Sequence, residues 1–192
     1  MKRITLLLIV SCLIGACNQS PEMQAFDKFK KKIPLVKLPY KKACFDTVSH
    51  LALNIPDSIF KKYAPEGASG IIGILKDTDY YSVILYSVAG DIQYPVIQTY
   101  DPEGSKLNDI GLIAGTCCGS NNTCSGYSWG EITKDLSIVL RDSEKVFKID
   151  TSLKIPKVKF SLINKSEVYA INDTGYIRLK PNQAQAIQQS GL

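Results

Sequence analysis

The chain has few of the residues that most often carry catalysis. It contains a single histidine, His50, and a single tryptophan, Trp129, among 192 residues. It has no Gly-x-Ser-x-Gly turn, no His-Glu-x-x-His motif and no glycine-rich phosphate loop before a helix. His50 stands among apolar residues, which favours a core or interface position over a general base. The sequence predicts no catalytic residue, and we expect a protein that is not an enzyme.

Metal-ligand patterns and a strong charge excess are also missing. The Cys-x-x-Cys pairs typical of zinc sites do not occur. Carboxylates such as Asp101 and Glu103 stand in turns, where aspartate is favoured for local hydrogen bonds, and they lack the spacing of a calcium-binding loop. The formal net charge is only +5, which does not imply a nucleic-acid partner. We therefore expect no metal, no cofactor and no nucleic acid.

The first residues of the chain have the layout of a secretory signal. Lys2 and Arg3 form a basic start, and a stretch of low polarity, residues 4–16, leads to Cys17. This stretch is well short of the roughly 20 apolar residues that a membrane-spanning helix needs. We therefore expect residues 1–16 to be a signal peptide.

The residues before Cys17 make this signal more specific. Ile14 stands three places before the cysteine, and the small residues Gly15 and Ala16 directly precede it. The segment resembles the lipobox of bacterial lipoproteins. The resemblance covers residues 1–17 alone and implies cleavage before Cys17 and acyl chains, such as palmitate, on that residue. It implies a lipid-anchored protein of the cell envelope.

Three further points concern the signal. Asn18 is not the aspartate that holds lipoproteins at the inner membrane of enteric bacteria, so the outer membrane is favoured. Cys12 also fits the lipobox pattern, but it would leave an apolar core of only about seven residues. An ordinary secreted protein with two incidental signal-peptide cysteines is the other alternative. We favour lipid attachment at Cys17.

Composition divides the rest of the chain into three parts. Residues 17–42 are expected to hold the lipid anchor, a polar tether over residues 18–25 and a basic leader. A solvated leader that partly docks onto the domain is favoured over one lying on anionic lipid headgroups. Residues 43–182 predict one β-rich domain, and residues 183–192 predict a polar tail, frayed helical or disordered. All the lysines of residues 17–42 lie in the basic leader: Lys28, Lys30, Lys31, Lys32, Lys37, Lys41 and Lys42.

Strand patterns dominate from residue 70 onward. Runs of β-branched and aromatic residues alternate with short turns such as residues 101–104, and strands joined by short turns pair antiparallel. A short helix is expected near residues 56–63. The predicted fold is mainly β, a single antiparallel β-meander domain in the form of a sandwich, a barrel or propeller-like blades. Its later strands are expected at 127–133, 136–141, 145–150, 158–163, 168–172 and 176–180.

Four cysteines follow the signal, an even number in a chain that is expected to leave the reducing cytosol. They are Cys44, Cys117, Cys118 and Cys124. A bridge between the adjacent Cys117 and Cys118 would be strained. We expect Cys124 to pair with Cys117 or Cys118, and the remaining cysteine to reach Cys44.

Aromatic residues supply the candidate binding surface. Ten tyrosines and Trp129 are present, and aromatic rings stack on sugars, bases and peptide side chains, although tyrosine is also an ordinary strand residue. We predict a non-enzymatic binding or assembly module that is held to the membrane through Cys17. Its edge strands or tyrosine face are expected to engage another envelope protein or a glycan. The alternative is an envelope hydrolase whose carboxylates come from separate loops.

Overall fold

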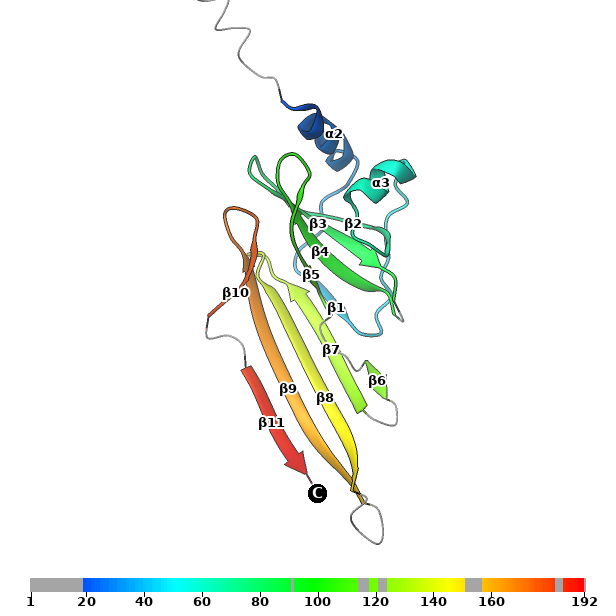
Figure 1. Ribbon diagram of the computed structural model, residues 1–192, viewed down its shortest axis with the longest axis vertical. Helices are drawn as coiled ribbons and strands as arrows, with labels where there is room; N and C mark the ends of the chain where they lie inside the picture. The colour runs from blue at the N-terminus through cyan, green and yellow to red at the C-terminus, as the bar shows by residue number, and fades with distance from the viewer. Residues whose placement is uncertain are drawn as a thin grey trace, which may run out of the picture.

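The computed structural model describes residues 19–90, 92–113, 118–120, 124–150, 157–181 and 185–191. These residues form two helices and eleven strands, and the strands make two antiparallel sheets (Figure 1). The prediction of a mainly β, antiparallel fold is confirmed. Cys12, Cys17 and Cys117 lie outside the described residues. Within the described part of the chain, no helix is long and apolar enough to cross a membrane.

The smaller sheet is a four-stranded meander. Its order is β2 (Ala68–Asp77), β3 (Ser82–Val88), β4 (Tyr94–Tyr100) and β5 (Lys106–Gly111). Every residue of β3 is buried, because this strand lies inside the sheet and both faces of the sheet are covered. That position explains the nearly continuous apolar pattern of β3 in the sequence.

The larger sheet has the order β1-β7-β8-β9-β10, with β6 paired to β7 and β11 paired to β9. Its two longest strands, of 13 and 15 residues, form one continuous antiparallel hairpin. The strand bounds are β1 (Tyr40–Ala43), β6 (Gly119–Ser120), β7 (Cys124–Ile132), β8 (Ile138–Asp150), β9 (Lys157–Ile171), β10 (Ile177–Leu179) and β11 (Gln185–Gly191).

β8 and β9 are single strands where the sequence predicts two pairs of shorter ones. The polar residues 142–144 and 164–167 separate the predicted strands, but the structure pairs Asp142 with Lys165 and Ser143 with Asn164 within one ladder. Their polarity does not end the strands, because residues with buried and with open side chains alternate along β8. The predicted breaks are therefore wrong.

The predicted polar tail at residues 183–192 is also wrong for its described part. β11 pairs antiparallel with β9, from Gln185 opposite Ser166 to Gly191 opposite Phe160. An edge strand offers unpaired N–H and C=O groups to any extended segment. Backbone pairing with the long β9 therefore orders a segment whose composition suggests a tail.

The N-terminal leader is part of the fold. Helix α2 (Pro21–Lys30) begins after Ser20, whose Oγ accepts a hydrogen bond from the Met23 N–H at 3.1 Å, as an N-cap residue does. The predicted tether over residues 18–25 is thus wrong from Pro21 onward. Helix α3 (Asp57–Tyr63) confirms the short helix expected near residues 56–63.

A buried lysine fixes α2 to the smaller sheet. Lys30 is 8% exposed, and its Nζ lies 3.2 Å from an Asp27 carboxylate oxygen and 2.7 Å from one of Asp77. Nζ also donates a hydrogen bond to Ser82 Oγ at 3.1 Å. A buried charge is tolerated when it is paired in this way, so the expectation that part of the leader docks onto the domain is confirmed.

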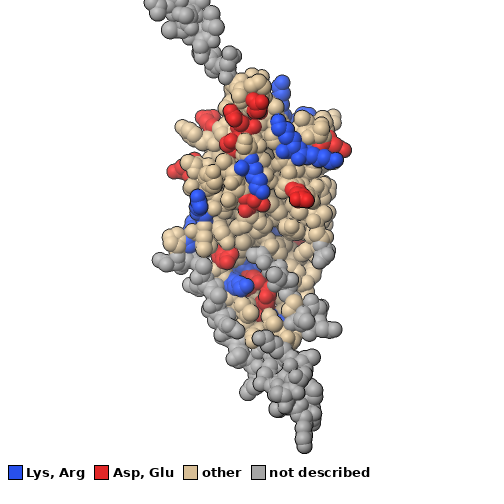
Figure 2. Space-filling model, viewed as in Figure 1, with Lys and Arg blue, Asp and Glu red and all other residues tan. Residues whose placement is uncertain are grey.

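The lysines of residues 17–42 do not form one basic surface. Lys30 is buried, whereas Lys41 lies on β1 and its Nζ is 3.1 Å from Glu131 Oε2. Lys42 donates to the Thr47 carbonyl oxygen at 2.7 Å. On the face drawn in Figure 2, acidic and basic side chains are interspersed. The single basic leader suggested by composition is therefore divided between two parts of the fold.

The smaller sheet is covered on both faces, so it forms the middle one of three layers (Figure 1). Its first face packs against α2 and α3 through an aromatic cluster: Phe26, Phe29, Tyr63, Tyr86 and Tyr100. Its second face packs against one end of the larger sheet through an aliphatic cluster: Val83, Leu85, Ile97, Ile132, Ile138 and Leu140. The other end of the larger sheet extends past the smaller sheet, and the candidate site lies toward that end.

Candidate functional site

β7 and β8 have one covered face and one open face. Ser128, Asp142 and Glu144 are buried, whereas Tyr127 and Arg141 are exposed. This alternation follows from the pleat of a strand, which turns successive side chains to opposite faces of the sheet. The two faces therefore carry different chemistry.

An aromatic pair stands on the open face. Tyr127 and Trp129 are two residues apart on β7, and Tyr127 is 51% exposed. Arg141 is paired with Trp129 across the ladder, and its guanidinium carbon lies 5.0 Å from the Trp129 ring centroid. Such a cation–π contact restrains both side chains. The sheet thus presents two aromatic rings and a guanidinium in a fixed arrangement.

Two hollows flank this aromatic pair. One, of about 350 Å³, lies toward β1 and is lined in part by Lys41, Lys42 and Asp46. The other, of about 430 Å³, lies toward β9 and falls within the size range of small-ligand sites. Six residues that line this second hollow lie on the open side of the strands, and together we call them the aromatic face. They are Tyr127, Trp129, Arg141, Ser143, Asn164 and Ser166.

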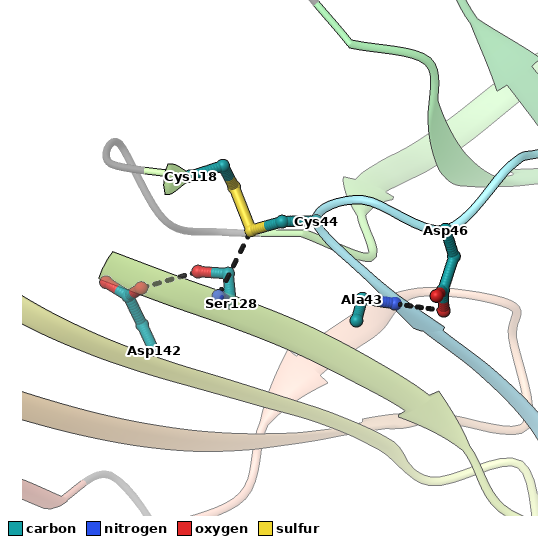
Figure 3. Close-up of a disulfide and its surroundings, with 6 residues drawn as sticks. All are labelled: Ala43, Cys44, Asp46, Cys118, Ser128 and Asp142. Carbon is teal, nitrogen blue, oxygen red and sulfur yellow. Dashed lines mark hydrogen bonds between the residues drawn. A yellow bond between two sulfur atoms is a disulfide. The ribbon is translucent and has the colours of Figure 1, made fainter. Parts of the chain in front are cut away.

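The covered face carries a disulfide and a carboxyl pair. Cys44 is bonded to Cys118, and its Sγ accepts a hydrogen bond from the Ser128 N–H at 3.1 Å (Figure 3). Ser128 Oγ donates to Asp142 Oδ1 at 2.5 Å. Burial raises the pKa of the Asp142 carboxyl, the Ser128 hydrogen bond opposes this shift, and the neighbouring Glu144 adds to it. This pair is buried, at 8% exposure for Asp142 and 7% for Glu144.

The disulfide selects one of the arrangements that the sequence left open. Cys44 pairs with Cys118 across a sequence separation of 74 residues, and Cys124 is also disulfide-bonded. Closing a loop of this length stabilises the fold by about 4 kcal/mol in the chain-entropy model. The bridge holds the segment after β1 against β7, beneath the aromatic face.

His50 and the turn carboxylates take no part in this site. His50 is exposed and lies against Gly70, so of the two predicted positions, core or interface, the core position is wrong and the interface position stays a prediction. Asp101 accepts hydrogen bonds from the N–H groups of Glu103 and Ser105 at 2.9 and 2.8 Å, which is the local role expected of a turn aspartate. Among the described residues, no group of three or more His, Cys, Asp or Glu side chains could hold a metal ion.

Four of the ten tyrosines belong to the buried core instead of a binding face: Tyr63, Tyr81, Tyr86 and Tyr100. Tyr86 and Tyr100 are 0% and 1% exposed, and their hydroxyls lie 2.7 Å apart in a hydrogen bond. Burial raises the pKa of both hydroxyls, and Tyr100 Oη donates to the Tyr63 carbonyl oxygen. Of the predicted binding residues, Tyr127 and Trp129 are the two that the structure places on the aromatic face.

Sequence reasoning missed the polar members of this face. Two cross-strand pairs supply them, Arg141 with Ser166 and Ser143 with Asn164. These pairs exist only because β8 and β9 are continuous and paired in one register. No short motif joins positions so far apart along the chain. The alternation of residues 139–145 is the one local signal that could have shown Arg141 and Ser143 to share a face.

No protein-family model, curated protein or solved structure matches this chain.

Proposed function

We propose that this protein is a lipid-anchored binding module of the bacterial cell envelope, favoured at the outer membrane, that holds another envelope component on its aromatic face. The exposed Tyr127 and the half-buried Trp129, with Arg141 stacked on the Trp129 ring, carry the proposal. Tyrosine, tryptophan and arginine are enriched among the few residues that dominate the binding energy at known interfaces. A site built on strands also keeps its side chains ordered before the ligand arrives.

The anchor in this proposal is Cys17, on the strength of the lipobox-like residues before it. Acyl chains on Cys17 would hold the protein stably, because two or more chains anchor where one does not. The docked helix α2 begins at Pro21, so few residues separate the acyl chains from the folded domain.

Cell fractionation tests the anchor. We expect Cys17→Ser in the full-length chain to move the protein out of the membrane fraction, and Cys12→Ser to leave it there. Circular dichroism of the released protein checks that the β domain is intact. If the Cys17→Ser protein stayed in the membrane fraction and the Cys12→Ser protein left it, the lipid would be attached at Cys12 and not at Cys17.

Cross-linking in native membranes tests the aromatic face. We expect Trp129→Ala to lose a component that the unchanged protein captures repeatedly. Tyr80→Ala is the matched control, since Tyr80 is 75% exposed and lies outside the aromatic face. Equal capture by the two variants would contradict the proposed site.

An envelope hydrolase is the second candidate, and the carboxyl pair on the covered face is the observation that favours it. Asp142 and Glu144 lie two residues apart on one strand, rather than on separate loops as the alternative expects. Both are buried, and Ser128 donates its hydroxyl to Asp142. These contacts suit a structural pair, so the binding module is the better-supported proposal.

A further inference from the structure

We infer that the ligand of the aromatic face is a glycan that carries carboxylate groups, with sugar rings stacked on Tyr127 and Trp129 and a carboxylate on Arg141. This inference rests on the proposed binding function and names the chemical class of its ligand. Three features of the site support it: a guanidinium outside the ion pairs of the described residues, an open side that carries no acidic side chain among its described lining, and a set of neutral polar side chains.

Arg141 is the charged group that selects the ligand. None of the ion pairs formed among the described residues includes Arg141, although Lys41 and Glu131 form one nearby. Its guanidinium is restrained over Trp129, so little further order is lost when it binds. A guanidinium offers two parallel N–H donors that match the two oxygens of a carboxylate.

The charges around this hollow favour an anion. Three charged residues line it: Arg141 lies on the open side, whereas Lys165 pairs with Asp142 across the ladder and shares the covered side with it. Asp142 is 8% exposed and accepts the Ser128 hydroxyl on the covered side. The open side of the hollow therefore presents one charge, the positive charge of Arg141.

The remaining side chains suit a sugar. Ser143 pairs with Asn164 and Arg141 with Ser166 across the ladder, so two hydroxyls and an amide share the open face with the aromatic rings. Ring faces stack on the apolar side of a sugar, and hydroxyl and amide groups donate and accept hydrogen bonds as sugar hydroxyls require. A protein partner would instead favour a larger apolar centre with a polar rim.

Tryptophan fluorescence tests the inference directly, because Trp129 is the single tryptophan of the chain. The full-length lipidated protein in detergent micelles is titrated with oligogalacturonate and with its methyl ester, which keeps the rings and removes the charge. We expect oligogalacturonate to cause a saturable change in Trp129 emission. The methyl ester should bind at least about tenfold more weakly than the acid.

Arg141→Gln separates charge recognition from stacking. This variant should lose at least about tenfold in affinity for oligogalacturonate and bind the methyl ester as the unchanged protein does. Arg178→Gln is the matched control, because Arg178 lies 5.4 Å from the Tyr176 ring centroid in a similar stacked pair outside the hollow. It should bind both compounds normally. Circular dichroism checks that each variant is folded.

Several results would overturn the inference. Equal affinity for acid and ester would do so, as would an Arg141→Gln variant that binds the acid normally. A single-stranded DNA oligomer that binds as tightly as oligogalacturonate would show general anion binding instead. If no glycan binds while Trp129-dependent capture of an envelope component persists, the glycan assignment fails and the proposed binding function stands.

Discussion

At the scale of single residues, Gly130 shows how closely the two sheets approach. A Cβ built at Gly130 would lie 2.0 Å from the Leu112 carbonyl oxygen and 2.6 Å from Leu112 Cγ. Backbone oxygen cannot move away as a flexible side chain does. Glycine is therefore required at this position by packing.

Gly130→Ala should lower the free energy of unfolding by about 2 kcal/mol, the usual cost of overfilling a packed core. The measurement is urea denaturation followed by circular dichroism. Gly111→Ala is the matched control, because the nearest neighbour of a Cβ built at Gly111, the Ile113 carbonyl oxygen, would lie at an ordinary 3.7 Å. Identical urea midpoints for the two variants would contradict the close approach.

Asp142 makes the stability of the fold depend on pH. Burial raises the pKa of its carboxyl above the ordinary 3.8, so this group contributes stability in its protonated form. That contribution is complete below the unfolded pKa and is lost as pH rises through the folded pKa.

Asp142→Asn should therefore raise the free energy of unfolding at about pH 7 and have little effect at about pH 4. The amide of the new asparagine can still accept a hydrogen bond from the Ser128 hydroxyl, and its NH₂ group can donate one to Glu144. Asp135→Asn is the control of opposite sign, because hydrogen bonds from Thr133 and Ser137 lower the Asp135 pKa. Urea denaturation at both pH values measures the difference, and a destabilised Asp142→Asn at neutral pH would contradict this account.

At the scale of elements, β11 covers an edge of β9 that the other described strands leave open over this length. It pairs with β9 over seven residue pairs, on the side of β9 away from β8. Without β11, that length of β9 would present unpaired N–H and C=O groups, which invite pairing with another chain.

Removal of residues 182–192 should make the protein associate. We expect light scattering and size-exclusion chromatography to show oligomers or aggregates at concentrations where the full chain is monodisperse. A chain with residues 185–191 replaced by a flexible Gly-Ser segment is the control for length and should behave like the truncation. If the truncated chain were as monodisperse as the full chain, the prediction that β11 keeps the edge of β9 from pairing with another chain would be wrong.

At the scale of the whole molecule, the docked leader sets how the protein stands on a membrane. From the proposed lipid site at Cys17, four residue steps reach Pro21, the first residue of α2, and each extended residue spans at most about 3.6 Å. The α2 end should thus lie within about 15 Å of the acylated residue. Figure 1 places α3 at the same end, and the β8–β9 hairpin runs away from it.

Energy transfer to labelled lipids tests this orientation. A dye attached through an unnatural amino acid at Lys62 on α3 should transfer more strongly to acceptor lipids than the same dye at Ser143 on β8. A flexible insertion between Asn18 and Gln19 should reduce the difference, because it frees the domain to turn. Equal transfer from both positions in the uninserted protein would contradict the orientation.

The sequence predicted the type of most elements and missed their continuity. The meander and the helix α3 follow from local patterns of apolar residues and turns, which act over a few positions. The length of β8 and β9 does not, since Asp142 and Glu144 look like a break in a strand. Both side chains are buried on the covered face, and this burial belongs to the folded sheet rather than to the local pattern of residues.

The candidate site divides in the same way. Trp129 and Tyr127 were recognised as binding residues by their chemistry. Arg141, Ser143 and Asn164 were not, because cross-strand register brings them together, and register is a property of the paired sheet rather than of either strand.

By itself, the sequence determined the β-rich class, the antiparallel pairing of strands joined by short turns and the candidate cysteines, because these depend on residues close together in the chain. It also supplies the lipobox-like signal on which the anchor is proposed. The tertiary structure decided that the leader docks as α2, that the C-terminal residues form β11 and that Arg141 stacks on Trp129. These features depend on contacts between distant segments, whose energies a local pattern does not contain.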